Sequence, residues 1–212
     1  MFKLGIVIAA AFFLSGCVSG TRTIELATPK YQNDKTAKGQ VYIDIIEDKR
    51  VFEAKPRSPS TPSATTDLAK VTKEARASLI GRQRNGYGKA MGDVTLPKAN
   101  NVQKEMRDLL KEGFESRGYT VSDNKNAPIK VQVDINKFWA WFTPGMWAVS
   151  FEANLDSDMN IANTDGNKKL NVVGYGINKG QVASDANWML AYERAFEDFL
   201  KNLDKALDDA KL

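Results

Sequence analysis

The chain has 212 residues, of which 42% are hydrophobic, and its 30 Lys and Arg residues against 26 Asp and Glu residues give a formal net charge of +4. The basic excess is small and forms no block along the chain, so no nucleic-acid partner is expected. The sequence contains no histidine, which excludes Ser-His-Asp and Cys-His catalysis and histidine-ligated metal sites, and we expect no enzyme, no cofactor and no metal.

The N-terminus has the pattern of an export signal. An apolar run over residues 4–14 follows Lys3 and is too short to span a bilayer, which takes about 20 apolar residues. Cys17 is the only cysteine, so no internal disulfide can form. The quartet Leu14-Ser15-Gly16-Cys17 resembles the lipobox of bacterial lipoproteins. This implies that residues 1–16 are a lipoprotein signal peptide and that Cys17 carries the lipid; the alternative is an ordinary signal peptide followed by a free or buried thiol.

The lipobox resemblance also implies a location. In lipoproteins of Gram-negative bacteria, an Asp after the acylated cysteine tends to retain the protein in the inner membrane, whereas here Val18 and Ser19 follow Cys17. We therefore expect palmitate on Cys17 and an outer-membrane location on the periplasmic face, with the membrane as one partner. Residues 17–39 are polar and are predicted to form a flexible lipidated tether, in which residues 23–26 could add a short edge strand.

Residues 40–212 are predicted to form a single periplasmic domain, because this length is typical of one domain. Val41, Ile43 and Ile45 alternate with other residues and indicate a half-buried strand. Residues 54–66 contain three prolines and many Ser and Thr residues, so we expect a surface loop or disordered insert that is dispensable for folding.

Two strands are predicted over residues 78–83 and 91–96, joined by a turn at Asn85-Gly86. A helix capped by Asn100 or Asn101 follows and ends at Gly118, before a short strand. Its apolar residues fall on one face. They are Val102, Met106, Leu109, Leu110, Gly113 and Phe114.

The clearest strand pattern begins at Ile129. Apolar residues of one parity continue to Trp141, interrupted only by Lys137, and predict that all of them share the core face. Turns at residues 143–145 and 163–166 then separate two more strands of a meander.

The last strand, over residues 170–179, contains Gly174 and Gly176, which are expected to mark a bend or a bulge. The final helix is predicted to have Asp185 as its cap and a continuous apolar stripe that covers the sheet. The stripe comprises Trp188, Tyr192, Ala195, Phe196, Phe199, Leu203 and Leu207. The order of elements predicts an α+β fold with a mainly antiparallel sheet covered by two helices.

The run from Leu109 to Tyr119 resembles the helix and following strand of the YajG-type lipoproteins. The lipobox, the segment Asp48-Lys49-Arg50 and residues 80–88 add to the resemblance. It implies a bacterial outer-membrane lipoprotein whose function is not established, and it implies no catalytic residue. A helix ending in Arg-Gly-Tyr before a strand also occurs in LptE-like assembly factors and in ABC-transport auxiliary lipoproteins.

Four aromatic residues flank a tight turn and form the first candidate contact site. They are Trp139, Trp141, Phe142 and Trp147. One interpretation places them at the end of the core, beneath the final helix. The other makes them an exposed patch at a hairpin tip that holds a protein partner, a glycan or a membrane surface.

Arg82 and Arg84 form the second candidate contact site, with Lys89 across the turn. They belong either to a solvated hairpin or to a site for an anionic group such as a lipid phosphate or a peptidoglycan carboxylate. The carboxylates of residues 44–48 are interpreted as a solvated strand edge rather than a cation site.

Three functions follow from these observations. The first is a non-enzymatic accessory or assembly component of a cell-envelope complex, which docks onto a protein partner by strand addition or through the aromatic hairpin. The second is a periplasmic module that binds a lipid or glycan between the sheet and a helix. The third is a carboxylate-dependent hydrolase of the cell wall.

Overall fold

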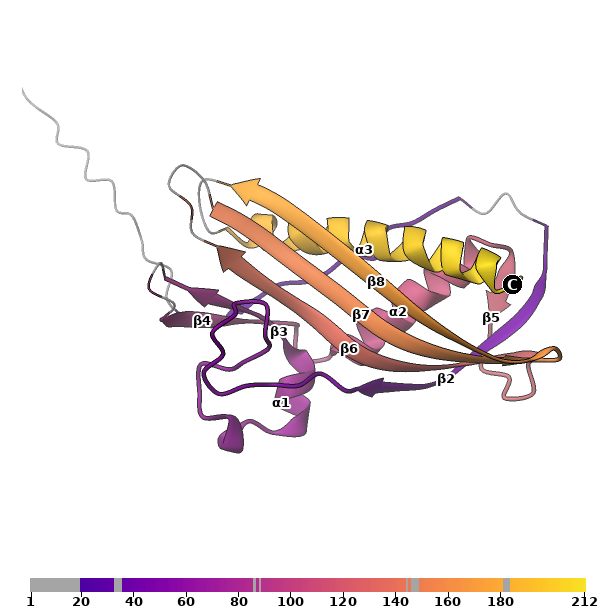
Figure 1. Cartoon of the computed structure of the whole chain (residues 1–212), viewed down its shortest axis with the longest axis horizontal. Helices are drawn as coiled ribbons and strands as arrows, with labels where there is room; N and C mark the ends of the chain where they lie inside the picture. The colour runs from indigo at the N-terminus through magenta and orange to yellow at the C-terminus, as the bar shows by residue number, and fades with distance from the viewer. Residues whose placement is uncertain are drawn as a thin grey trace, which may run out of the picture.

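The structure is a computed structural model that describes residues 20–32, 36–85, 87, 89–143, 145, 149–180 and 184–212. In this part of the chain eight strands form one sheet, and two long helices cover one of its faces (Figure 1). The α+β fold class predicted from the sequence is confirmed. The elements are β1 (Arg22–Thr23), β2 (Gly39–Asp48), a 3-10 turn (Leu68–Lys70), α1 (Lys73–Ser78), β3 (Leu79–Arg84), β4 (Ala90–Thr95), α2 (Val102–Glu115), β5 (Tyr119–Val121), β6 (Ile129–Thr143), β7 (Val149–Asn163), β8 (Gly166–Gly180) and α3 (Asp185–Asp209).

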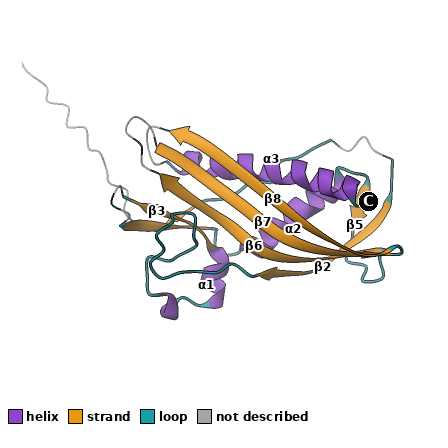
Figure 2. Ribbon diagram, viewed as in Figure 1, coloured by secondary structure: helices purple, strands orange, loops and turns teal. Residues whose placement is uncertain are grey.

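Strand β6 is the centre of the sheet. On one side, β6, β7 and β8 form an antiparallel meander of long strands. On the other side, β2 pairs in parallel with the first half of β6, and β3 pairs in parallel with its second half. Strand β5 lies beyond β2, and β4 and then β1 lie beyond β3. Figure 2 shows the resulting layers, with the two long helices, α2 and α3, on one face of the sheet.

Helix α3 lies along the meander and buries the whole of the predicted stripe, from Trp188 to Leu207. It approaches β8 closely, because a Cβ atom on Gly174 would lie 2.4 Å from the carbonyl oxygen of Ala195, and one on Gly176 would lie 2.2 Å from that of Ala191. The pairing of β7 with β8 shows no register shift at these glycines. A bulge at these glycines is therefore excluded, and their lack of a side chain lets the helix backbone lie directly on the strand.

The long helices begin at polar caps. The side chain of Asn101 accepts a hydrogen bond from the N–H of Lys104 at the start of α2, as predicted. The N-cap of α3 is Ser184, whose hydroxyl accepts a hydrogen bond from the N–H of Asn187. Asp185, which was expected to be the cap, is the first residue of the helix.

A β-bulge in β6 reverses the predicted alternation of side chains. The register against β7 shifts between Ile135 and Lys137, so β6 contains one extra residue there. Phe138 therefore takes over the core face, and Trp139 and Trp141 move to the opposite face. The prediction of one parity from residue 129 to residue 141 is wrong for this reason.

A second bulge lies in β2, between Ile43 and Ile46. It leaves Ile45 49% exposed, and Ile46 packs against the core in its place. The guanidinium group of Arg107 in α2 donates hydrogen bonds to the carbonyl oxygens of Ile43 (2.7 Å) and Asp44 (3.2 Å), which stabilises the irregular backbone.

Residues 20–32 belong to the predicted flexible tether, but they are packed against the domain. Strand β1 pairs with β4, and Ile24 is buried in the core. The carboxylate of Glu112 accepts hydrogen bonds from Nζ of Lys30 (3.0 Å) and from the N–H of Tyr31 (2.6 Å). The described part of the tether is therefore fixed at several points. Among the helices that the structure describes, none has the length and apolarity to span a membrane.

Candidate functional site

Two tryptophans of the predicted aromatic site lie buried on the sheet face opposite α3. Trp139 is 1% exposed and Trp141 is 8% exposed. They pack with Ala64 and Leu79 to form what we call the tryptophan cluster, which is bordered by Phe52, Leu68 and Val71. These two residues are neither beneath the final helix nor part of an exposed patch, so both interpretations are corrected.

The other two aromatic residues do not join the tryptophan cluster in the described structure. Phe142 is half-buried on the core face, with its ring 5.7 Å from that of Phe151. Trp147 lies outside the described residues. Strand alternation places Phe142 on the face opposite the two buried tryptophans, and the bulge in β6 makes the face of Phe142 the core face.

The tryptophan cluster is covered by residues 54–66. The indole N–H of Trp139 donates a hydrogen bond to the carbonyl oxygen of Pro59 (3.1 Å). Asp93 accepts hydrogen bonds from both the N–H and the hydroxyl of Thr65 (3.0 and 2.8 Å), and Ser63 is fully buried. The expected surface loop or disordered insert is therefore wrong, because this segment closes a second apolar face of the sheet.

Arg82 and Arg84 are also covered, with 9% and 8% of their surfaces exposed. The guanidinium group of Arg84 donates hydrogen bonds to the carbonyl oxygen of Pro56 (2.9 Å) and to the hydroxyl of Ser63 (3.4 Å). Burial lowers the pKa of Arg82, and the nearby Asp93 opposes this shift. The expected solvated hairpin is wrong for these two residues, whose guanidinium groups are turned into the protein rather than presented to an anionic ligand.

Arg50 joins the end of β2 to the tryptophan cluster. Its fully buried side chain forms an ion pair with Asp48, at 2.8 Å from Nε to Oδ1. The same guanidinium group donates hydrogen bonds to the carbonyl oxygens of Arg76 (2.8 Å), Leu79 (2.7 Å) and Phe138 (2.9 Å). The predicted solvated edge at Asp48 is therefore part of a buried network, which links α1, β3 and the bulged part of β6.

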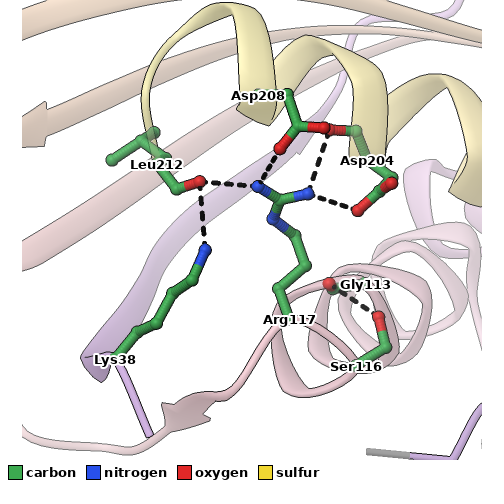
Figure 3. A network of polar contacts seen from close by, with 7 residues as sticks. All are labelled: Lys38, Gly113, Ser116, Arg117, Asp204, Asp208 and Leu212. Carbon is green, nitrogen blue, oxygen red and sulfur yellow. Dashed lines mark hydrogen bonds and ion pairs between the residues drawn. The ribbon is translucent and has the colours of Figure 1, made fainter. Parts of the chain in front are cut away.

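Arg117, which follows α2, joins the end of that helix to the C-terminal end of α3 (Figure 3). Its guanidinium group forms ion pairs with Asp204 and Asp208 and donates a hydrogen bond to the carbonyl oxygen of Leu212 (2.6 Å). Lys38 donates to the same carbonyl oxygen (3.4 Å). Cations at these positions stabilise the C-terminal end of α3, where carbonyl groups lack partners within the helix. In the motif Arg117-Gly118-Tyr119, the arginine therefore has a structural role, because it fixes the C-terminal end of α3.

The outer edge of β8 is closed by a row of polar side chains from α3. Arg194 donates to the carbonyl oxygen of Ile177, Asp198 accepts from the N–H of Tyr175 (3.0 Å), and Asn202 donates to the carbonyl oxygen of Val173 (2.9 Å). These helix residues are four apart and therefore lie on one face. Three of the outward-facing backbone groups in the middle of β8 are thus already bonded, and a strand added there would have to displace these bonds.

Glu105, in the first turns of α2, is a described carboxyl group whose pKa is strongly shifted from its ordinary value. Burial raises its pKa to about 7, and a hydrogen bond donated by the side chain of Asn100 opposes this shift. The partner of Glu105 is thus an amide and not a second carboxyl group, which differs from the pair that a carboxylate-dependent hydrolase uses.

Glu105 is expected to make the stability of the protein fall as the pH rises. Its folded-state pKa of about 7 lies above the ordinary value of 4.5 for a glutamate. The stabilisation by the proton is therefore complete below pH 4.5 and is lost as the pH rises through about 7. Urea unfolding at pH 8 should show Glu105→Gln to be more stable than the parent by about 1–2 kcal/mol, after allowance for solvent screening. The two should be alike at pH 4.

Glu115→Gln on the same helix is the control, because Glu115 is partly exposed and forms only a long ion pair with Lys111 (4.0 Å). It should change stability by less than about 0.5 kcal/mol at either pH. A Glu105→Gln variant that gains nothing at pH 8 would contradict the assignment of the raised pKa.

The open face of the meander has a polar hollow of about 600 Å³. Its polar lining residues are Gln132, Asp134, Asp158, Asn160, Lys169 and Asn171. The carboxylate of Asp158 accepts hydrogen bonds from the side-chain amides of Asn171 (2.9 Å) and Asn136 (2.7 Å), and these bonds lower its pKa. Over the described residues, no group of three or more Asp, Glu, Cys or His side chains is arranged to hold a metal ion.

Comparison with solved structures gives distant similarities. The protein XCC0632 of Xanthomonas campestris is 10% identical with a TM-score of 0.48, over 91% of this chain and 99% of that one. The hypothetical protein CT253 of Chlamydia trachomatis is 10% identical with a TM-score of 0.41, over 81% and 98% of the two chains. Scores of this size carry no statement about function.

No curated protein matches the chain. One family model, described as "Uncharacterized lipoprotein", matches residues 63–207. The match covers more than half of the chain and includes β3 to β8, α2 and most of α3. The chain therefore belongs to this family of uncharacterized lipoproteins.

Proposed function

We propose that the protein is a lipid-anchored accessory or assembly component of a cell-envelope complex, without enzymatic activity. The observation that carries the proposal is the quartet Leu14-Ser15-Gly16-Cys17 in a chain of a lipoprotein family. Cys17 is the acylated residue, and Val18 directs the protein to the periplasmic face of the outer membrane. The finer assignment to the YajG-type lipoproteins rests on the run from Leu109 to Tyr119.

Docking through side chains is the mode that the contacts favour. Strand addition along the middle of β8 would have to displace the bonds from Arg194, Asp198 and Asn202. The open face of the same strand carries an apolar row of exposed residues instead. They are Val173, Tyr175 and Ile177, and an apolar surface on another envelope protein would bury them.

A glycan-binding module is the second candidate. The space between the sheet and the helices is filled by the apolar core, which disfavours a lipid ligand there. The polar hollow on the open face has amide and carboxylate groups held in place by one another, and these suit the hydroxyl groups of a sugar.

The anchor is tested by Cys17→Ser. Cells labelled with radioactive palmitate should show label in the parent and none in the variant, because the thiol is the acylated group. The variant should also leave the membrane fraction, since acyl chains supply the anchoring free energy. Equal labelling of the two proteins would contradict the proposal.

Val18→Asp is the matched control for location. It keeps Cys17, so labelling should be unchanged, but separation of inner and outer membranes on a density gradient should move the protein to the inner membrane. An unchanged gradient position would contradict the sorting role of Val18 and leave the acylation result standing.

A further inference from the structure

The first described residues of the chain are attached to the hairpin end of the sheet. Strand β1 runs parallel to β4, and the N–H of Gly20 donates a hydrogen bond to the carbonyl oxygen of Met91 (2.9 Å). The absence of a side chain at Gly92 permits this contact, because a Cβ atom there would lie 1.8 Å from the carbonyl oxygen of Gly20. The chain therefore enters the domain at the end of β4 where the β3–β4 hairpin turns.

A second attachment fixes the same residues to α3. Arg22, whose side chain is 8% exposed, forms an ion pair with Asp185 (2.6 Å), and it donates a hydrogen bond to the side chain of Gln83 (3.3 Å). Residues 20–23 are thus bonded to β3, β4 and the start of α3. They do not act as a swivel between the membrane and the domain.

The distance from this attachment to the lipid is short. Gly20 is three residues from Cys17, and three extended residues span at most about 10 Å. The hairpin extends past Met91 by two residues on β4, to Lys89, about 7 Å, and Tyr87 lies beyond the pair of Asn85 and Lys89. By chain length alone, Cys17 is within about 10 Å of Gly20, a reach similar to the length of the hairpin beyond Met91.

The side chains at this end have the chemistry of a membrane interface. Tyr87 is 98% exposed, and Lys89 is exposed beside it. By register, Thr143, Ser150 and Lys179 mark the same end of the meander, and Figure 1 places these strand ends near the start of the described chain. Tyrosine rings favour the headgroup region, and lysines are attracted to anionic lipid.

We propose that this end of the domain rests on the bilayer, with Tyr87 and Lys89 in the headgroup region, so that the lipid anchor and the hairpin hold the sheet in one orientation. The occupant of the hairpin surface is a phospholipid bilayer. This inference rests on the proposed acylation of Cys17. The polar hollow, lined by residues of the opposite halves of β6, β7 and β8, then faces away from the membrane.

The test uses the full acylated protein in vesicles of phosphatidylethanolamine and phosphatidylglycerol. Acylation occupies the sulfur of Cys17, so Lys89→Cys supplies one free thiol for a nitroxide label. Asp165→Cys is the matched control, because Asp165 is exposed in the β7–β8 turn, roughly 50 Å away at the other end of these strands. The label at residue 89 should lose collisions with a water-soluble nickel complex, and the label at residue 165 should keep them.

The following outcomes would contradict the proposed contact between the hairpin and the bilayer, or a part of it. Equal nickel accessibility at residues 89 and 165 would overturn the proposal. Protection of residue 89 in native envelopes but not in vesicles would also overturn it, in favour of a protein partner. A protein that carries no palmitate and does not float with the vesicles would instead refute the anchor itself. Tyr87→Ser in the Lys89→Cys background should restore part of the nickel accessibility, whereas no change would remove Tyr87 from the contact.

Discussion

Replacing Phe196 by alanine should lower the free energy of unfolding by about 3–5 kcal/mol, because it leaves a cavity between α3 and the sheet. The ring of Phe196 is fully buried and lies 5.9 Å from that of Phe138 and 5.8 Å from that of Tyr192. Neither neighbour can fill the space without leaving its own contacts. Urea unfolding of the domain that lacks residues 1–17 measures the loss.

Glu197→Ala is the matched control on the next residue of the helix. Glu197 is exposed, so its removal should change the free energy of unfolding by less than about 0.5 kcal/mol. If Phe196→Ala unfolds at the same urea concentration as the parent, then α3 does not stabilise the sheet as the packing indicates, and its apolar stripe is a docking surface instead.

Replacing Arg50 by methionine should have a similar effect, about 3–5 kcal/mol, through a different cause. The change leaves the carboxylate of Asp48, only 10% exposed, without its ion-pair partner. It also removes the donor to three backbone carbonyl oxygens around the tryptophan cluster. Tryptophan fluorescence during urea unfolding reports on this region directly.

The adjacent residue provides the control for Arg50. Lys49 pairs with Glu47 at the surface, where both side chains are about half exposed, so Lys49→Ala should leave the urea midpoint nearly unchanged. Asp48→Asn combined with Arg50→Met should recover part of the loss, because it removes the unpaired buried charge. Equal effects of the Lys49 and Arg50 substitutions would contradict a buried network.

The elements that the sequence predicts best are those with a long, uninterrupted apolar period. The stripe of α3 and the apolar face of α2 span several turns, so a single irregularity does not hide them. It was harder to predict which residues of a strand face the core, because one extra residue moves all the following side chains to the opposite face of the sheet. The bulge in β6 is marked within its strand only by the polar Lys137, which interrupts the apolar row, and both bulges depend on pairing with distant residues.

The tryptophan cluster did leave a signal in the sequence. Residues 138–142 are apolar without alternation, a pattern typical of a strand buried on both faces. A second buried face requires a cover, and residues 54–66 provide it even though their composition is that of a loop. Composition alone was misleading because burial depends on what lies opposite a segment. Of the packing of residues 20–32, the sequence predicted only a short edge strand, expected over residues 23–26 and found as β1 at residues 22–23.

The closed edge of β8 has a consequence for how copies of this protein meet. Molecules held by short anchors on one membrane share an orientation and a thin layer of solvent, which raises their effective concentration. Under these conditions a bare strand of fifteen residues would be a template for side-by-side polymerisation of sheets. Arg194, Asp198 and Asn202 occupy the backbone groups that such growth would use. If the protein is anchored and oriented as proposed above, the row on α3 would oppose the growth of such polymers in the plane of the membrane.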